Sequence, residues 1–153
     1  MDQIESKLKE LGYALPNPPT PGANYLPFRI NGDTLILAGT ITISNGVLTH
    51  VGQVGKDHDV AAGYAAARIC ALNTLASIKL ALGSLDRVKE FLYLGGYVNA
   101  VNGFAESPQV INGASDLFVS LYGDAGKHAR AAVSVAGLPR NATVEIQVTV
   151  RFA

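Results

Sequence analysis

The sequence contains little cysteine and little charge, and each shortage excludes a class of protein. Of its 153 residues only Cys70 is a cysteine, so the chain can form neither an internal disulfide nor a cysteine-based metal site. Charged residues make up 16% of the chain, and 12 basic against 12 acidic residues give a formal net charge of zero. A neutral chain does not favour a nucleic-acid partner, because phosphate binding needs a basic surface.

The sequence shows no pattern typical of a signal peptide or a membrane span. No continuous apolar run is long enough to span a bilayer, and the acidic start Met1-Asp2-Gln3-Ile4-Glu5 is unlike the basic start of a signal peptide. We therefore expect a cytoplasmic protein with no membrane partner. The length and the 48% apolar composition predict one domain over residues 1–153 with a full core.

Residues 1–23 are predicted to form a short helix and a proline-rich connector. Ile4, Leu8 and Leu11 share one side of a helix over residues 2–11, and Gly12 ends it. Four prolines between Leu15 and Gly22 exclude a helix or a central strand there.

The rest of the chain alternates strand and helix patterns. Strands are predicted over residues 25–30, 34–37, 47–51, 88–98 and 143–152, with another that begins at Arg130. Helices are predicted over 59–82 and from Ser107, as N-cap, to Gly123. Gly95-Gly96 suggests a bulge or a close backbone approach. The simplest packing is an α+β fold with a mixed six-stranded sheet and two long helices on one face.

Arg130 and Glu145 are the candidate chemical groups, because each is a lone charge in a strand. Arginine forks onto carboxylates, and a nearby glutamate could hold or activate a water. A structural ion pair or two solvated charges would explain the same pattern. A tight hairpin would place Glu145 opposite Ser134 and Arg130 ~13 Å away. Sharing a site therefore requires an intervening strand or a long reach.

Other polar residues give weaker signals. Asn112-Gly113 interrupts an apolar helix, which indicates either function or a need for close packing. Cys70 is expected to be a buried small side chain. His50, His58 and His128 lack the spacing of metal ligands, so no metal site is predicted.

The segment from Ala129 to Ile146 resembles the signature region of the YjgF/RidA family. The matching residues are Ala129-Arg130, Val133, Val135-Ala136, Leu138-Pro139 and Val144-Glu145-Ile146. Upstream, Ala67-Arg68 with Asn73 and Leu75, Asn112 with Phe118, and Ala38-Gly39 with Tyr25 resemble further family motifs.

This resemblance implies a chorismate-mutase-like fold, here with an extra N-terminal helix, that closes as a homotrimer with sites between subunits. Archetypal members hydrolyse reactive enamines and imines to 2-oxo acids and ammonia, without metal or cofactor. Carried over, Arg130 would bind the carboxylate of a small metabolite and Glu145 would orient the attacking water. The residues that would line the substrate site are Tyr25, Ala38, Gly39, Asn112 and Ala132.

Two alanines depart from the archetype. Ala38 replaces a small hydroxyl residue, and Ala132 replaces a frequent cysteine. These departures indicate a divergent subgroup with a reshaped pocket. A non-catalytic metabolite-binding or regulatory protein on the same trimeric scaffold is therefore the alternative. A ribonuclease or translation inhibitor is a third reading, which the neutral charge disfavours.

Overall fold

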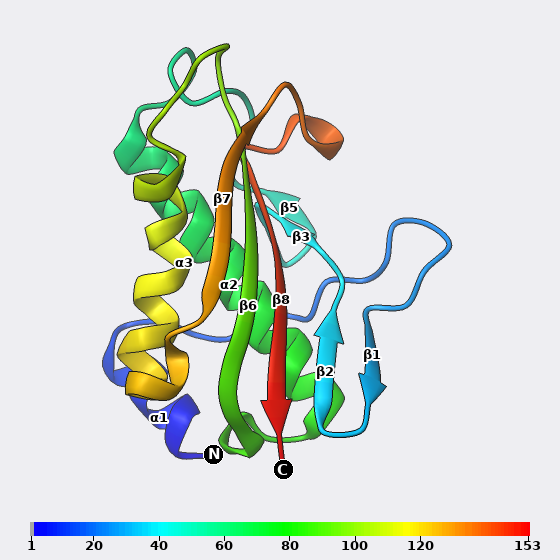
Figure 1. Cartoon of the computed structure of the whole chain (residues 1–153). Coiled ribbons are helices and arrows are strands. Elements are labelled where there is room, and N and C mark those ends of the chain that lie inside the picture. The colour runs from blue at the N-terminus through cyan, green and yellow to red at the C-terminus, as the bar shows by residue number, and fades with distance from the viewer. Residues whose placement is uncertain (1) are drawn as a thin grey trace.

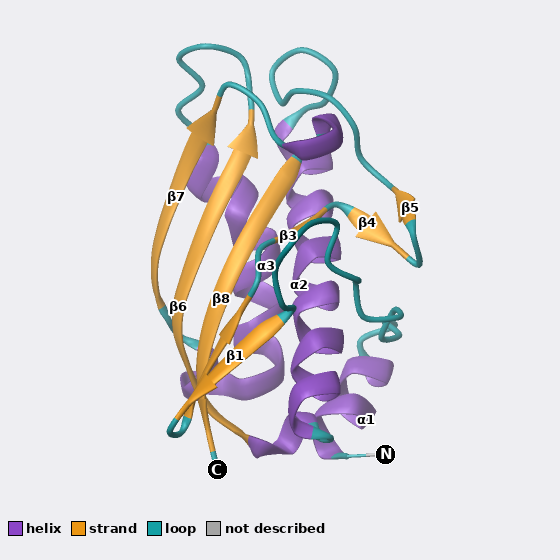
Figure 2. Ribbon diagram, turned by 90° about the vertical axis from the view of Figure 1, so that its right-hand side faces the viewer, coloured by secondary structure: helices purple, strands orange, loops and turns teal. Residues whose placement is uncertain are grey.

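The computed structural model describes residues 2–153 as two layers, a sheet and a layer of helices. Helices α2 (Val60–Leu82) and α3 (Ser107–Tyr122) both cover the same face of the sheet (Figure 1). Seen from the side, the opposite face carries no helix (Figure 2). The predicted α+β architecture with both long helices on one face is confirmed.

The six-stranded sheet is mixed, as predicted, with the order β1-β2-β8-β6-β7 and with β3 also on β8. Its strands are β1 (Phe28–Asn31), β2 (Thr34–Leu37), β3 (Thr40–Ile41), β6 (Val88–Asn99), β7 (Ala129–Val135) and β8 (Val144–Phe152). Only β6 and β7 run parallel. Strand β6 thereby lies between the strands that carry Arg130 and Glu145.

Two predicted strands are shorter than the sequence indicated. The first begins at Phe28 rather than at residue 25, directly after Pro27. The predicted strand over 47–51 ends at Leu48, because it pairs only as β5 (Val47–Leu48) with the two-residue β4 (Ile43–Ser44) in a separate hairpin. Val51 makes only an isolated bridge to Ala142.

The helix ends follow local chemistry, with one correction. Asp59 caps α2 through a hydrogen bond to the Ala62 amide, and Gly83 ends it with a φ of 80°. The N-cap of α3 is Glu106, not Ser107, whose hydroxyl instead lies 2.5 Å from that of Ser134 on β7. The N-terminal helix α1 (Gln3–Glu10) is confirmed, with Asp2 as its cap.

Two glycines permit close packing, one between the two long helices and one between α3 and the sheet. A Cβ on Gly113 would lie 2.0 Å from the Tyr64 carbonyl oxygen, so α2 and α3 pack here backbone against backbone. A Cβ on Gly96 would meet Ile111 at 2.7 Å, so this glycine lets α3 sit on β6. The Gly95-Gly96 pair therefore marks a close approach, and the bulges of β6 lie earlier, between Val88 and Tyr93.

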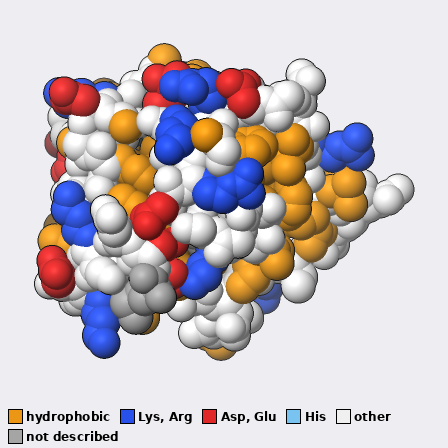
Figure 3. Space-filling model, turned by 90° about the horizontal axis from the view of Figure 1, so that it is seen from below, with side chains coloured by type: hydrophobic (Ala, Val, Ile, Leu, Met, Phe, Trp, Pro, Cys, Tyr) orange, Lys and Arg blue, Asp and Glu red, His pale blue; other side chains and the backbone are white. Residues whose placement is uncertain are grey.

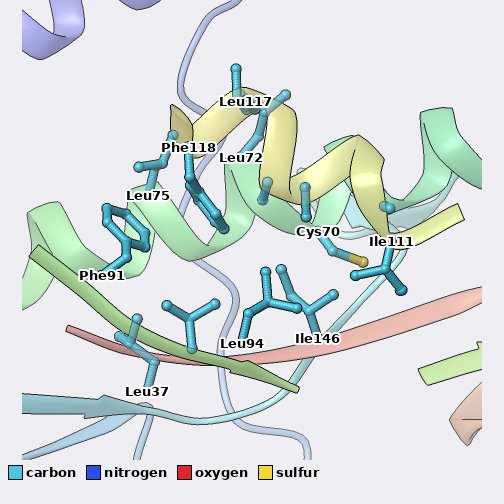
Figure 4. Packing of buried hydrophobic residues seen from close by; sticks show 14 of the residues in the cluster. Leu37, Cys70, Leu72, Leu75, Phe91, Leu94, Ile111, Leu117, Phe118 and Ile146 are labelled. Carbon is cyan, nitrogen blue, oxygen red and sulfur yellow. The ribbon is translucent and has the colours of Figure 1, made fainter. Parts of the chain in front are cut away.

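The core lies between the two layers (Figure 4). Phe91 of β6 stacks obliquely on Phe118 of α3, with ring centroids 4.5 Å apart. Leu75 and Cys70 of α2 and Ile146 of β8 are fully buried in the same cluster. Burial raises the pKa of the Cys70 thiol well above its usual value, which fits the predicted role as a packing residue.

Helix α2 is long and apolar enough to cross a membrane by length and composition alone. Within this fold 67% of its most apolar window is buried, so it serves as the central helix of the core. Three short 3₁₀ turns complete the chain, at Leu85–Arg87, Gly123–Gly126 and Pro139–Asn141.

Candidate functional site

Glu145 lies in a pocket next to Gly39. Its neighbours Val144 and Ile146 point into the core, so the alternation of β8 turns Glu145 to the opposite face of the sheet. Its Oε2 atom would lie only 2.6 Å from a Cβ on Gly39. The absence of a side chain at position 39 therefore leaves the space that this carboxylate occupies.

The pocket around Glu145 has a cavity volume of about 1010 Å³ and is walled by the proline-rich connector. Its lining includes Pro18, Pro19, Tyr25, Ala38, Gly39 and Arg140. The Tyr25 hydroxyl accepts a hydrogen bond from the Gly22 amide, which holds the end of the connector. The chain thus brings three of the predicted substrate-site residues, Tyr25, Ala38 and Gly39, to Glu145.

The Glu145 carboxylate has no ion-pair partner among residues 2–153. Partial burial raises the pKa of Glu145 above its ordinary value. A half-buried carboxylate with a raised pKa accepts a proton from a bound water more readily than an ordinary glutamate does.

Arg130 points to the other side of the sheet. Its guanidinium donates from Nη1 to the Ser115 hydroxyl at 3.0 Å and from Nη2 to the Pro108 carbonyl at 3.1 Å. Both acceptors belong to α3, so β7 presents Arg130 to the helix layer. Because these contacts leave other N–H groups of the guanidinium unused, Arg130 can still bind an anion.

Asn112 and Ala132 lie with Arg130 rather than with Glu145. Asn112 falls between Pro108 and Ser115 on the same face of α3, because positions four and three apart share a face. Ala132 follows Arg130 by two residues on β7 and packs at the margin of the core.

The predicted site residues therefore fall into two groups. The Glu145 group consists of Tyr25, Ala38, Gly39 and Glu145, and the Arg130 group consists of Asn112, Arg130 and Ala132. On β6, Leu94 is opposite Arg130 and Tyr97 is opposite Glu145. Two strand spacings of about 4.8 Å and an offset of three residues separate the two Cα atoms. One chain does not bring the two charges together.

Sequence reasoning assigned no site role to several residues that complete each group. Arg140 lines the pocket with a φ of 57°, and Asn73 donates to the carbonyls of Ile41 and Ile43 beside it. Ser115 accepts a hydrogen bond from Arg130, and the Ser115 hydroxyl is in turn hydrogen-bonded to His128. Asn73 carried a signal, because a buried amide in an apolar helix requires partners. The others depend on contacts that only the fold creates.

The uncovered face of the sheet carries exposed apolar side chains. Ile36 pairs with Thr149, Thr149 with Tyr93, and all three turn away from the helices. Ile36, Tyr93 and Val133 are 44%, 39% and 45% exposed. From below, hydrophobic side chains gather on the side of β1, β2 and the connector, and charges of both signs are dispersed elsewhere (Figure 3).

Comparison with known families identifies the group to which this fold and these residues belong. A family model described as "YjgF/chorismate_mutase-like, putative endoribonuclease" matches residues 5–151. The chain belongs to the YjgF family. The match includes both groups of candidate residues and all six strands of the sheet.

Two relatives cover almost the whole of this YjgF chain. Protein TCP17 of Trypanosoma cruzi is 40% identical over 151 residues, which are 98% of this chain and 94% of the relative. The crystal structure of Atu1372 from Agrobacterium tumefaciens, described as of unknown function, is 45% identical with a TM-score of 0.92. The alignment covers 98% of this chain and 92% of Atu1372.

A more distant structure connects the chain to RidA. The crystal structure of RidA from the Antarctic bacterium Psychrobacter sp. PAMC 21119 has a TM-score of 0.63 at 21% identity, with 89% of this chain and 94% of RidA covered. At that identity the likeness shows the shared fold. The chain is thus a divergent member of the family, closer in sequence to TCP17 and Atu1372.

Proposed function

We propose that this YjgF protein hydrolyses reactive enamines and imines to 2-oxo acids and ammonia, in clefts between the subunits of a homotrimer. The observation that carries the proposal is the pair of separate half-sites, a partly buried carboxylate in a pocket and an arginine held on the other side of the sheet. Each half-site holds one of the two groups that the reaction needs. A second copy of the chain would supply the missing one.

The uncovered sheet face supports the assembly. A sheet with helices on one face leaves the other to be covered, and here that face carries Ile36, Tyr93 and Val133. Packing three such faces together would bury these side chains. It would also bring the Arg130 group of one subunit toward the Glu145 group of its neighbour.

In the proposed reaction Arg130 binds the substrate carboxylate through its guanidinium fork. An enamine first becomes the imine as a proton moves from its nitrogen to its terminal carbon. A water held by Glu145 then adds to the carbon of the C=N bond, and one water proton passes through the carboxylate to the nitrogen. Collapse of the resulting carbinolamine forms the C=O bond and breaks the C–N bond, while the hydroxyl proton passes through Glu145 to the nitrogen, which leaves as ammonia. One water is consumed, and no metal or cofactor takes part.

The test supplies 2-aminoacrylate from a coupled amino-acid dehydratase and measures the rate of 2-oxo acid release. The native protein is expected to accelerate release, and Arg130→Ala to abolish the acceleration. Arg130→Lys should recover little, because an ammonium lacks the planar fork. Arg29→Ala is the matched control, since Arg29 is an exposed strand arginine for which the described residues show no ion pair. Native protein that behaves like Arg130→Ala would exclude the enzyme.

The second candidate is a non-catalytic protein that binds a 2-oxo acid or a related carboxylate on the same scaffold. It is favoured by Ala38, which lines the pocket without offering a hydroxyl. Binding of a 2-oxo acid that depends on Arg130, without accelerated release, would select this candidate. The mixed charges in Figure 3 and the zero net charge give less support to a ribonuclease.

A further inference from the structure

Arg130 is the first member of a hydrogen-bond chain that ends at His128. The Ser115 hydroxyl, which accepts from Arg130, lies 2.8 Å from Nε2 of His128. Nδ1 of the same imidazole lies 2.8 Å from the Gly126 carbonyl. These hydrogen bonds connect β7, α3 and the 3₁₀ turn at Gly123–Gly126. They hold Arg130, the side chain expected to bind the ligand.

The partners of this chain allow one arrangement of protons. A carbonyl oxygen only accepts, so Nδ1 of His128 carries the hydrogen and Nε2 of the neutral ring is an acceptor. The Ser115 hydroxyl then donates to Nε2 and accepts from Arg130. Each group thus satisfies its neighbour, and Arg130 is held in a single orientation.

Protonation of His128 reverses one of these bonds. With both ring nitrogens carrying hydrogen, Nε2 becomes a donor and Ser115 loses the acceptor of its proton. The Ser115 oxygen then faces two cationic donors, the imidazolium and the guanidinium. The electrostatic repulsion between them favours movement of Arg130 away from Ser115.

No carboxylate within the described residues compensates for a charge on His128. On the 3₁₀ turn Asp124 pairs with Lys127, on α3 Asp116 accepts from the Tyr64 hydroxyl, and on β6 Glu90 pairs with Arg151. The Phe118 ring packs edge-on to the imidazole, with the two ring centroids 6.3 Å apart, and contributes an apolar contact. Burial lowers the pKa of His128, and the nearby Arg130 charge lowers it further against the opposing bond to Gly126.

We propose that His128 and Ser115 are positioning residues that hold Arg130 ready for a carboxylate ligand only while His128 is neutral. Affinity for the ligand then falls as the pH drops through the range in which His128 takes up a proton. This inference rests on the proposed function of Arg130 as the carboxylate anchor. Neither Ser115 nor His128 needs to touch the ligand.

The first experiment determines the proton positions in this hydrogen-bond network in the absence of ligand. Nitrogen-15 NMR of the intact protein at pH 8 is expected to show His128 as the tautomer with hydrogen on Nδ1. Ser115→Ala removes the partner of Nε2 and should shift that nitrogen's signal, whereas Ser120→Ala, an exposed serine on the same helix, should not. Hydrogen on Nε2, or a charged ring at pH 8, would overturn the proposed arrangement.

The second experiment measures binding of 2-oxobutyrate by calorimetry between pH 8 and 4.5, where this acid stays ionised. Native protein should lose affinity toward the acid end of this range, by up to roughly fivefold as His128 becomes protonated, the size of one net hydrogen bond. His128→Gln keeps an acceptor that does not titrate, so its affinity should stay flat and near the pH 8 value. Ser115→Ala should bind roughly fivefold more weakly at every pH. Ser115→Thr, which restores the hydroxyl, should recover the native profile.

Three results would overturn the proposal. They are a flat profile for the native protein, the native slope in His128→Gln, and an affinity that rises toward acid pH, as it would if the imidazolium bound the ligand directly. His50→Gln is the control for the other half-buried histidine with a lowered pKa. If no 2-oxobutyrate bound native protein at any pH, the carboxylate site and its pH dependence would both fail. The NMR result would still report whether His128 and Ser115 position Arg130.

Discussion

Arg130 and Glu145 lie on opposite faces of one sheet, on strands that are separated by β6. Arg130 is hydrogen-bonded to α3 of the helix layer, and Glu145 lies in the pocket beside the proline-rich connector. The two residues are fifteen positions apart in the sequence, but within one chain their side chains do not meet. A site that uses both groups requires two chains.

Mixing two inactive variants tests this requirement. Arg130→Ala and Glu145→Gln should each be inactive in the 2-aminoacrylate assay. Co-expressed, they should recover about a quarter of native activity, because random mixing makes one in four clefts fully intact. The assembly state is checked by sedimentation. Mixed trimers without any recovered activity would place both groups in a single chain's site, and a monomer would remove the shared cleft.

Gly39→Ala tests the space that Glu145 occupies. The new Cβ would lie 2.6 Å from Oε2, so the carboxylate must move, which its flexible side chain allows. We expect a change in unfolding free energy within about 0.5 kcal/mol and a loss of activity of about 10²-fold. Thermal unfolding and the coupled assay measure the two effects. Full activity would show that the position of Glu145 at Gly39 is not used.

Glu145→Gln should raise stability at neutral pH while it removes activity. Because burial raises the folded-state pKa of Glu145 above 4.5, the ionised form is disfavoured in the fold. Ionised Glu145 therefore destabilises native protein at pH values above its folded-state pKa. This destabilisation disappears below the pKa of the unfolded state, where the carboxyl is protonated in both states. Glu145→Gln should melt about 1 to 2 °C higher at pH 7, with no difference from native protein below about pH 4. Glu10→Gln, at an exposed position, should show no such difference.

Gly113→Ala should destabilise the packing of α3 on α2. A Cβ there would meet the Tyr64 carbonyl oxygen at 2.0 Å, so α2 and α3 must separate. We expect a loss of roughly 1–3 kcal/mol in the free energy of unfolding, measured with denaturant. Gly137→Ala is the matched control, because its Cβ would meet no atom within 4 Å. Equal stability of the two variants would contradict the close packing of the helices.

Much of the fold followed from local pattern. The alternation of Val144, Ile146 and Val148 with Glu145 and Gln147 predicted which face of β8 is buried. Asp59 and Gly83 marked the ends of α2. The prediction of Ser107 as the N-cap of α3 was wrong. Its hydroxyl contacts Ser134 on another element, and no local pattern shows that contact. Gly113 is unfavourable within a helix, but its lack of a side chain permits the close contact of α3 with α2.

The candidate site was likewise predictable only in part. Its family signature identified Arg130 and Glu145, and the structure assigned each to its own half-site. The hydrolase activity, the trimeric assembly and the cytoplasmic location stay predictions. Ser115, His128 and Arg140 could not be found from the sequence, because a hydroxyl, an imidazole or a guanidinium outside the apolar core carries no pattern until its partners are known.

Periodicity and side-chain chemistry over a few residues were enough to predict most of the elements, their buried faces and the chemical types of the two charged groups. The positions of those groups depend on long-range packing. Insertion of β6 between β7 and β8 is a long-range pairing. Its register puts Arg130 opposite Leu94 and Glu145 opposite Tyr97, which lie on opposite faces of the sheet. The hydrogen bonds that hold Arg130 come from α3 and are set by the packing of that helix on the sheet.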